Sequence, residues 1–353
     1  MLDEGAGDLD AKTFQERLER RAISLSFSSD RDAFRGSVRV LSEHRDEAFE
    51  LLRLALTSPR FDQEAIDRIR ASILAANKRS LTNPDEVAGL HWFAQAFPNH
   101  PYGRPVKGDE KSIGGIERAM LFEYAKKNLA RSNLKIAVVG SVDSAELLRL
   151  IDHAFAKLPA QADLVEIPEV APQSLGRREV VDLNIPQTTI TFGGLGLKRK
   201  EPDFIPAFVL NHILGGGAFS SRLYREVREK RGLAYSVYSY LATLNRSGLF
   251  MGGTSTRNDR AAEALKIIEQ EIVRIAAEGP TAEELAQAKS YLTGSYLLHF
   301  DTSAKVAQQL LAIQLEELGA DYIRRRNDMV NAVTADDVRR AAKRFLTDSK
   351  LFV

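Results

Sequence analysis

The sequence is short of several features that would point to a particular chemistry. Its 353 residues contain no cysteine, which excludes disulfides, thiolate zinc sites and cysteine nucleophiles. No apolar run approaches the roughly 18 residues that a membrane-spanning helix needs, so no membrane segment is expected. Lys and Arg total 49 against 48 Asp and Glu, a net charge of +1. A nucleic-acid partner is therefore not expected, because proteins that bind a polyanion usually carry more basic than acidic residues.

Histidine is also scarce. None of the histidines has another within five positions, so no two of them lie one helical turn apart, as zinc ligands on a helix often do. The six are His44, His91, His100, His153, His212 and His299. The absence of cysteine suits either a bacterial periplasm or a cytoplasm, so the compartment stays open. A signal peptide upstream of Met1 would favour the periplasm.

The composition that remains is typical of a folded globular protein. Hydrophobic residues make up 44% of the chain and charged residues 27%, which is well clear of the composition of disordered chains. A length of 353 residues is long for one domain and comfortable for two.

The most informative stretch runs from Gly215 to Tyr240. It opens with three consecutive glycines, Gly215, Gly216 and Gly217, which allow close approaches that a Cβ would forbid. A phosphate-binding loop is disfavoured, because no Lys-Ser/Thr pair follows at the required spacing. A structural turn or a flexible loop is the better interpretation of these glycines.

A helix and a strand follow the glycines. Ser220 or Ser221 can cap a helix that carries Leu223 and Val227 on one face. After Gly232 the pattern changes to period two, which predicts a strand. In that strand, one face is expected to carry Tyr235, Val237 and Ser239, and the other Ser236, Tyr238 and Tyr240.

The chain also repeats itself. A helix from Arg45 with Phe49, Leu52 and Leu56 inward, then a turn and a second helix over Gln63–Asn77, is matched in the second half. There a helix follows Asn258-Asp259, Gly279-Pro280 forms the turn, and Thr281 with Glu284 forms a capping box. In addition, 20–23 corresponds to 231–234, and 83–88 to 302–307. Two copies of one unit explain these matches most simply.

The repeat predicts an α/β (α+β) fold with two related domains, each a mostly antiparallel sheet covered on one face by helices. We place the domains at residues 1–165 and 177–353, with the Pro-containing segment Pro159–Gly176 as the linker. Further strands are expected at Leu134–Val139, Val180–Leu183 and Thr188–Phe192. Because the second copy ends at Val353 within an expected strand, and nothing before Met1 corresponds to 180–214, we expect a fragment of a longer protein.

The Gly215–Tyr240 stretch resembles the second-domain signature of the pitrilysin/insulinase-type (inverted-zincin) metallopeptidases, a family that includes the mitochondrial processing peptidases. The segments 100–105 (HPYGRP), 138–140 (VVG) and 192–194 (FGG) fit the same family. In that family an Arg and a Tyr seven positions apart contact the substrate backbone. The resemblance therefore implies that Arg228 and Tyr235 bind substrate; otherwise they would be an ordinary surface arginine and a half-buried strand tyrosine.

The resemblance also implies that this chain lacks a metal site. Active members bind zinc through an H-x-x-E-H motif and a further Glu on a later helix. The position of that Glu corresponds to Ala76, which cannot be a ligand. The resemblance thus implies an inactive, N-terminally truncated first domain, with no catalytic residue and no cofactor bound by this chain.

The function implied by the resemblance is that of a non-catalytic subunit of a bacterial heterodimeric zinc endopeptidase. Zinc is then expected on the catalytic partner, a chain of the same family, and peptides are the substrates. Two alternatives stay open. The chain could be an active zinc peptidase whose ligand motif is missing from this fragment, or a structural homologue like the core subunits of respiratory complexes. Whether the partner is a different chain or a second copy is undecided.

Overall fold

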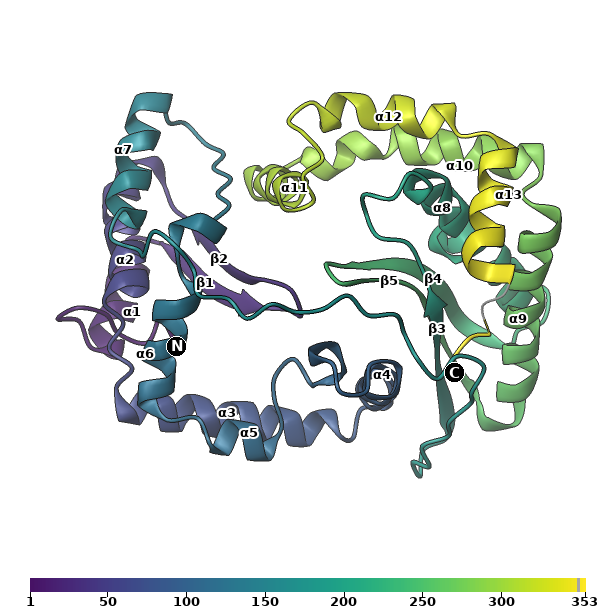
Figure 1. Cartoon of the computed structure of the whole chain (residues 1–353), viewed down its shortest axis with the longest axis horizontal. Helices are drawn as coiled ribbons and strands as arrows, with labels where there is room; N and C mark the ends of the chain where they lie inside the picture. Colours follow the sequence, from purple (N-terminus) through teal and green to yellow (C-terminus); the bar gives the residue numbers. More distant parts are fainter. Residues whose placement is uncertain (348–349) are drawn as a thin grey trace. The chain divides into compact units, whose positions relative to one another are not determined.

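The computed structural model describes residues 1–347 and 350–353, and it divides the chain into two compact units (Figure 1). Unit 1 comprises Met1–Arg79, Val106–Glu166 and Phe300–Leu315, and unit 2 comprises Ser80–Pro105, Ile167–His299 and Glu316–Val353. These units are defined by spatial contacts and are discontinuous in sequence. The domains expected at 1–165 and 177–353 are repeat units of the sequence, and they stay a prediction.

Unit 1 is built on a two-stranded antiparallel sheet. Strand β1 (Ser24–Ser29) pairs with β2 (Phe34–Arg39). Its core buries residues of α1 (Ala11–Arg20), including Phe14, and of α2 (Arg45–Thr57), including Leu51. The other elements are η1 (Ser42–His44), α3 (Gln63–Ser80, whose last residue belongs to unit 2), α5 (Glu110–Gly114), α6 (Arg118–Asn128), η3 (Arg131–Asn133), α7 (Ser144–Phe155) and α11 (Ser303–Leu315).

Unit 2 is built on a three-stranded antiparallel sheet of order β3-β5-β4. The strands are β3 (Gln187–Leu195), β4 (Ala234–Leu244) and β5 (Ser247–Arg257). The other elements are α4 (Pro84–Ala96), η2 (Pro101–Gly103), α8 (Phe204–Asn211), η4 (His212–Gly216), η5 (Ala218–Ser220), η6 (Tyr224–Glu229), η7 (Asn258–Arg260), α9 (Ala261–Glu278), α10 (Ala282–Gly294), η8 (Tyr296–Phe300, whose last residue belongs to unit 1), α12 (Tyr322–Ala332), α13 (Ala335–Ala342) and η9 (Lys343–Thr347).

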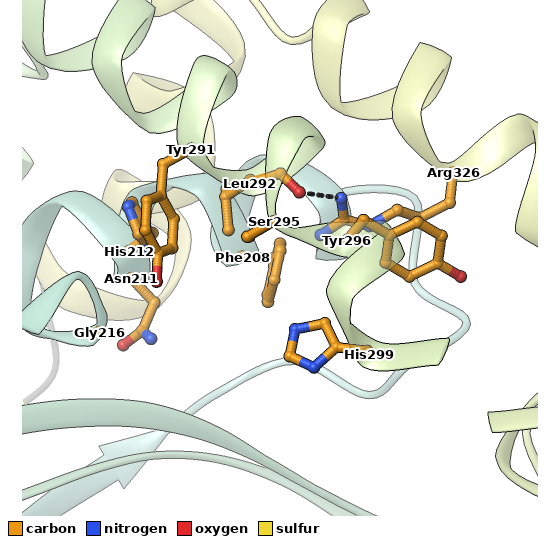
Figure 2. Close-up of a pocket in the computed structure, with 10 residues that line it drawn as sticks. All are labelled: Phe208, Asn211, His212, Gly216, Tyr291, Leu292, Ser295, Tyr296, His299 and Arg326. Carbon is orange, nitrogen blue, oxygen red and sulfur yellow. Dashed lines mark hydrogen bonds between the residues drawn. The ribbon is translucent and has the colours of Figure 1, made fainter. Parts of the chain in front are cut away.

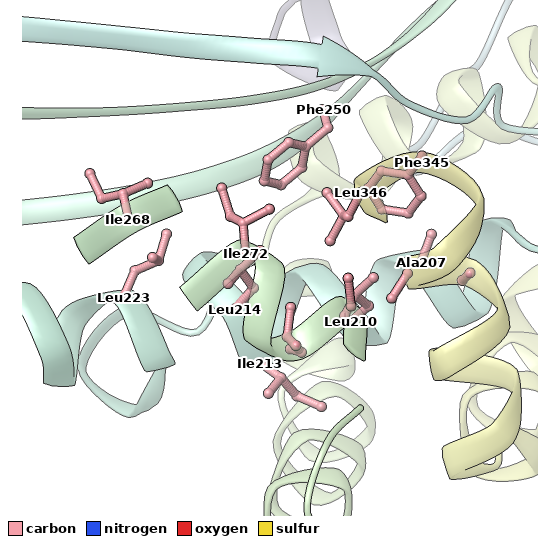
Figure 3. Close-up of a cluster of buried hydrophobic side chains, with 14 of the residues drawn as sticks. Ala207, Leu210, Ile213, Leu214, Leu223, Phe250, Ile268, Ile272, Phe345 and Leu346 are labelled. Carbon is pink, nitrogen blue, oxygen red and sulfur yellow. The ribbon is translucent and has the colours of Figure 1, made fainter. Parts of the chain in front are cut away.

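One face of the unit 2 sheet is covered by helices as expected, and the other face is also covered at β5, although Tyr238 and Tyr240 of β4 are exposed on that side. Phe250 of β5 packs into the larger cluster, where side chains of α8, η4, α9 and η9 meet (Figure 3). Its neighbours Leu249 and Met251 pack into a second cluster with Trp92 of α4. Side chains alternate between faces along a strand, so β5 buries apolar residues on both sides. The reason is that different elements pack on the two faces of β5, with α8, η4, α9 and η9 on one side and α4 on the other.

The predicted fold class is confirmed, since α and β elements combine with small antiparallel sheets packed against helices. The repeat reappears in three dimensions as one element order. In each copy a helix, a β-hairpin, a short 3-10 turn and two longer helices follow one another: α1-β1-β2-η1-α2-α3 and η6-β4-β5-η7-α9-α10. The capping box of Thr281 and Glu284 also forms as predicted.

Two predicted strands do not form. Residues 134–139 and 180–183 are described, but neither segment is paired as a strand. Their alternating apolar residues favour an extended chain, yet a strand also needs a neighbour for its backbone groups. The 134–139 segment receives a side-chain hydrogen bond from Gln314 at the Ile136 carbonyl instead. Thr188–Phe192, by contrast, lies within β3 as predicted.

The repeat extends to backbone conformation. Ala22 and Gly232 each lie two residues before a strand, β1 or β4, and both have positive φ, 49° and 59°, so the structure shifts the match of 20–23 with 231–234 by one residue. A left-handed conformation costs an L-residue about 1–2 kcal/mol, whereas glycine adopts it freely. The first copy therefore carries a strain that the second avoids.

We expect opposite effects on stability from replacing Ala22 by glycine and from replacing Gly232 by alanine. Ala22→Gly should raise the free energy of unfolding by about 0.5–1 kcal/mol, and Gly232→Ala should lower it by about 1 kcal/mol. A Cβ at Gly232 would meet nothing within 4 Å, so only the backbone conformation is at issue there. Urea unfolding of the two variants checks this. A loss of stability in both would contradict the assignment of strain to Ala22.

Candidate functional site

The helix that carries Arg228 is a π-helix. Element η6 (Tyr224–Glu229) has wider turns than an α-helix, and Lys230 N donates to Arg225 O five residues back. Leu223 and Val227 are fully buried, as their shared face predicted. Ser221 caps the helix start, because its Oγ accepts from Tyr224 N at 3.4 Å. Single π-turns are frequent at functional sites.

A β-bulge decides where Tyr235 points. The pairing of β4 with β5 shifts between Ala234 and Val237, so the alternation of side chains is interrupted there. Val237 and Ser239 are buried, as expected for one face, but Tyr235 is 81% exposed. The prediction that Tyr235 shares their face is therefore wrong. The bulge turns its ring out to solvent on the side of η6.

Arg228 and Tyr235 are in contact. The guanidinium carbon of Arg228 lies 4.4 Å from the centre of the Tyr235 ring and 4.9 Å from that of Tyr224. Phe219 packs edge-on against Tyr224 at 5.1 Å. We call these four residues the Arg228 cluster. Cation–π contacts of this kind hold an arginine in place without using its N–H donors.

The donors of Arg228 remain available. Within the described part of the chain, its half-buried guanidinium forms no ion pair or side-chain hydrogen bond. Its helix neighbours Arg222 and Arg225 are both paired with Glu284. A guanidinium with five unused N–H groups beside an exposed tyrosine hydroxyl can donate to peptide carbonyl oxygens. This arrangement suits binding of an extended peptide backbone.

A buried charge network anchors the helix that carries the cluster. Arg222, with a side chain only 4% exposed, donates Nε to Glu284 Oε1 at 2.8 Å and Nη2 to Oε2 at 2.6 Å. Arg225 adds a hydrogen bond to Oε1 at 2.8 Å. Burial alone would raise the pKa of Glu284, but the hydrogen bonds from Arg222, Thr281 N and Arg225 lower that pKa to about 2. The network ties η6 to the start of α10.

A second carboxylate fixes the other end of the helix. Glu226, also buried, accepts from Lys230 and Arg231 at 2.6 and 2.7 Å. These hydrogen bonds outweigh the effect of burial and lower the pKa of Glu226. Nearby Glu271 on α9 differs, because burial, with Glu226 adding to it, raises its pKa despite an ion pair with Arg274. Ion pairs to Glu284 and Glu226 therefore hold the helix that carries the Arg228 cluster.

The three glycines are required by close packing. A Cβ on Gly215 would lie 2.5 Å from Ser239 Oγ, one on Gly216 2.7 Å from Asn211 Nδ2, and one on Gly217 2.7 Å from His212 O. Gly215 and Gly216 complete the π-helix η4, and the turn predicted from the glycines begins at Gly217. That these glycines form a flexible loop stays a prediction.

The sequence pattern missed two members of the cluster. Tyr224 precedes Arg228 by four positions, a spacing that places both residues on one side of a helix. This spacing could have identified Tyr224 from the sequence. Phe219 could not have been found from spacing, since the 3-10 turn η5 positions it.

A metal centre is not built by the described residues. In residues 1–347 and 350–353 no group of three or more His, Asp or Glu side chains lies together as metal ligands would. Ala76 lies near the end of α3, in unit 1. Among the described helices, none is long and apolar enough to cross a membrane.

Comparisons with known proteins place the chain in a family. The sequence model of the peptidase M16 inactive domain matches residues 115–292, about half of the chain. The chain therefore belongs to the peptidase M16 inactive-domain family, which confirms the resemblance to this metallopeptidase group. Its relatives include a non-peptidase homolog.

Individual relatives agree with this assignment. The chain is 29% identical to an uncharacterized zinc protease of Streptomyces coelicolor, covering 92% of this chain and 74% of that one. It is 28% identical to the non-peptidase homolog YmxG of Helicobacter pylori, covering 86% and 70%. It is also 28% identical to the mitochondrial-processing peptidase subunit beta of Blastocladiella emersonii, covering 89% and 69%.

A solved structure shows the same fold. The peptidase M16 inactive domain from Pseudomonas fluorescens superposes with a TM-score of 0.94 at 29% identity, covering all of this chain and 84% of that one. A Helicobacter pylori protease structure, at 19% identity and a TM-score of 0.88, shares the fold over 99% of this chain.

Proposed function

We propose that this chain is the non-catalytic subunit of a zinc endopeptidase and supplies substrate-binding residues to a metal site on its partner. The observation that carries the proposal is the Arg228 cluster, in which a guanidinium that has no acidic partner among the described residues stacks on the exposed ring of Tyr235. The partner is a zinc-bearing chain of the same family, and the substrate is an extended peptide. No cofactor is assigned to this chain.

The local geometry suggests how a peptide would be held. Within the described residues β4 pairs only with β5, so it forms an edge of the sheet, where the carbonyl oxygens of Ser236 and Ser239 already accept from the side chains of Thr254 and Asn211. An extended peptide can add to such an edge as a further strand. Arg228 and Tyr235 lie where β4 begins, and they could then donate to carbonyl oxygens of the bound peptide. Tyr235 could also stabilise an oxyanion that develops on a scissile carbonyl.

The first test is reconstitution. We expect the purified chain to cleave no peptide alone and to restore cleavage of a quenched fluorescent peptide library when mixed with an H-x-x-E-H-bearing family member of the same organism. The mixture should elute as one complex in size-exclusion chromatography. Chelator-sensitive cleavage by this chain alone would contradict the proposal and favour an intact zinc peptidase. A complex that forms without any gain in cleavage would favour a structural role.

A further inference from the structure

Unit 2 contains a pocket away from the Arg228 cluster. It has a volume of about 210 Å³, is partly open to solvent, and is lined by residues of α8, η4, α10, η8 and α12 (Figure 2). Its apolar surface comes from Phe208, Tyr291, Leu292 and Tyr296, and a comparable polar surface comes from Asn211, His212, Ser295, His299 and Arg326. Empty apolar cavities of about 150 Å³ bind benzene, so this pocket has room for one aromatic ring and a small polar group.

An arginine forms part of the pocket wall. Arg326 is 7% exposed, although the Arg324-Arg325-Arg326 run predicts a solvated helix face. Figure 2 shows its guanidinium extending toward Leu292 and Ser295, beside the Tyr296 ring. The guanidinium carbon lies 4.5 Å from the centre of that ring and 5.5 Å from the centre of Phe208. Burying an arginine is costly unless its charge is compensated.

The compensation within the protein is partial. Arg326 Nη1 donates to Leu292 O at 2.5 Å and to Asn327 Oδ1 at 3.0 Å, which places the cation at the C-terminal end of α10. The negative end of a helix dipole offsets part of a positive charge. In the described part of the chain no carboxylate pairs with Arg326, and its Nε and Nη2 make no hydrogen bond.

A second cation increases the local positive charge. The guanidinium carbon of Arg199 lies 4.4 Å from the centre of the Phe204 ring and 5.1 Å from that of Tyr322, and Arg199 donates a hydrogen bond to the Tyr322 hydroxyl. Across residues 1–347 and 350–353 it forms no ion pair. Burial lowers the pKa of Arg326, and the positive charge of Arg199 acts in the same direction. Arginine nevertheless stays charged at neutral pH. Arg199 does not line the pocket, but its charge adds to that of Arg326 in the pocket wall, so the pocket favours an anion.

The remaining polar wall adds no negative charge. Burial lowers the pKa of His212, so its ring is neutral at pH 7 and stacks on Tyr291 at 5.0 Å. Asn211 lies on the same side, but its side chain is engaged with Ser239. An apolar body with a single anionic group therefore matches the pocket better than a multiply charged or fully polar ligand.

We infer that this pocket binds a carboxylate attached to an apolar or aromatic body, with the carboxylate on Arg326 and the body against Phe208 and Tyr291. The inference does not depend on the proposed peptidase role. Two sources share the chemistry, a free aromatic acid and the C-terminal residue of a peptide. A carboxylate accepts two hydrogen bonds from one guanidinium, which would use the donors that the protein leaves unpaired.

The test is isothermal titration of the full chain with four probes: 3-phenylpropionate, N-acetyl-alanyl-phenylalanine, 3-phenylpropionamide and inorganic phosphate. We expect at least one of the two carboxylates to bind, and the amide to bind roughly tenfold more weakly or worse, because a charge-assisted hydrogen bond is lost. The tighter carboxylate identifies the source. No carboxylate binding at about 10 mM, equal binding of the amide, or tighter binding of phosphate would overturn the inference.

Three variants locate the site. Arg326→Gln should weaken carboxylate binding roughly tenfold or more, while Arg324→Gln, which removes the same charge from an exposed position of the same helix, should leave it within about twofold. Ser295→Leu fills the pocket without removing the arginine, so it tests the site even if Arg326→Gln folds poorly. Unchanged binding in a folded Ser295→Leu protein would refute this location.

Discussion

Replacing Arg228 by alanine is expected to lower kcat/KM of the reconstituted peptidase by about 10²–10³, the range seen when one preorganised donor to a reacting group is removed. The fold should persist, because Arg228 has no ion pair in the described residues and its helix is held by the separate pairs of Glu284 and Glu226. Cleavage kinetics with the zinc-bearing partner, together with size-exclusion chromatography, measure both effects.

A substitution at Tyr235 tests the contribution of its hydroxyl to the same reaction. Tyr235→Phe keeps the ring under Arg228 and removes only the hydroxyl, so we expect a smaller loss of about tenfold or more in kcat. Tyr238→Phe is the matched control, since Tyr238 is also exposed on β4 but lies outside the Arg228 cluster. Equal kinetics of wild type and Tyr235→Phe would limit the role of Tyr235 to positioning Arg228. Full activity of Arg228→Ala in an intact complex would refute the proposed function.

Replacing Glu284 by glutamine is expected to have the largest effect on stability, a loss of about 3–5 kcal/mol, as when one partner of a buried ion pair is removed. Arg222 would stay buried without its counter-charge. Glutamine retains the ability to accept from Thr281 N, so the capping box can persist and the loss reports the charge. Glu283→Gln, an exposed neighbour in the same helical turn, should change stability by less than about 0.5 kcal/mol.

The same pair predicts a dependence on pH. The pKa of Glu284 falls from 4.5 to about 2 in the folded chain, so the carboxylate contributes stability above about pH 4.5 and loses that contribution as the pH falls toward 2. The difference in unfolding free energy between wild type and Glu284→Gln should therefore shrink over this interval. Urea unfolding at several pH values tests this. A difference that is constant from pH 6 to pH 2 would show that the charge of Glu284 is not the cause.

Much of the architecture could be predicted from local pattern. The apolar steps of three and four in α9 and the Thr281-Glu284 capping box predicted elements that the structure contains. These features depend on residues close together in sequence, so the sequence carries the information directly.

The sequence by itself therefore determined the pattern of several helices, the repeated unit and the family, and through the family resemblance it singled out Arg228 and Tyr235. Only the tertiary structure decided that a bulge turns Tyr235 outward, that β5 buries both of its faces, and that Arg326 lines a pocket instead of a solvated surface. The physical reason is common to all three. Register, burial and charge compensation are set by partners distant in sequence, and local periodicity contains no information about them.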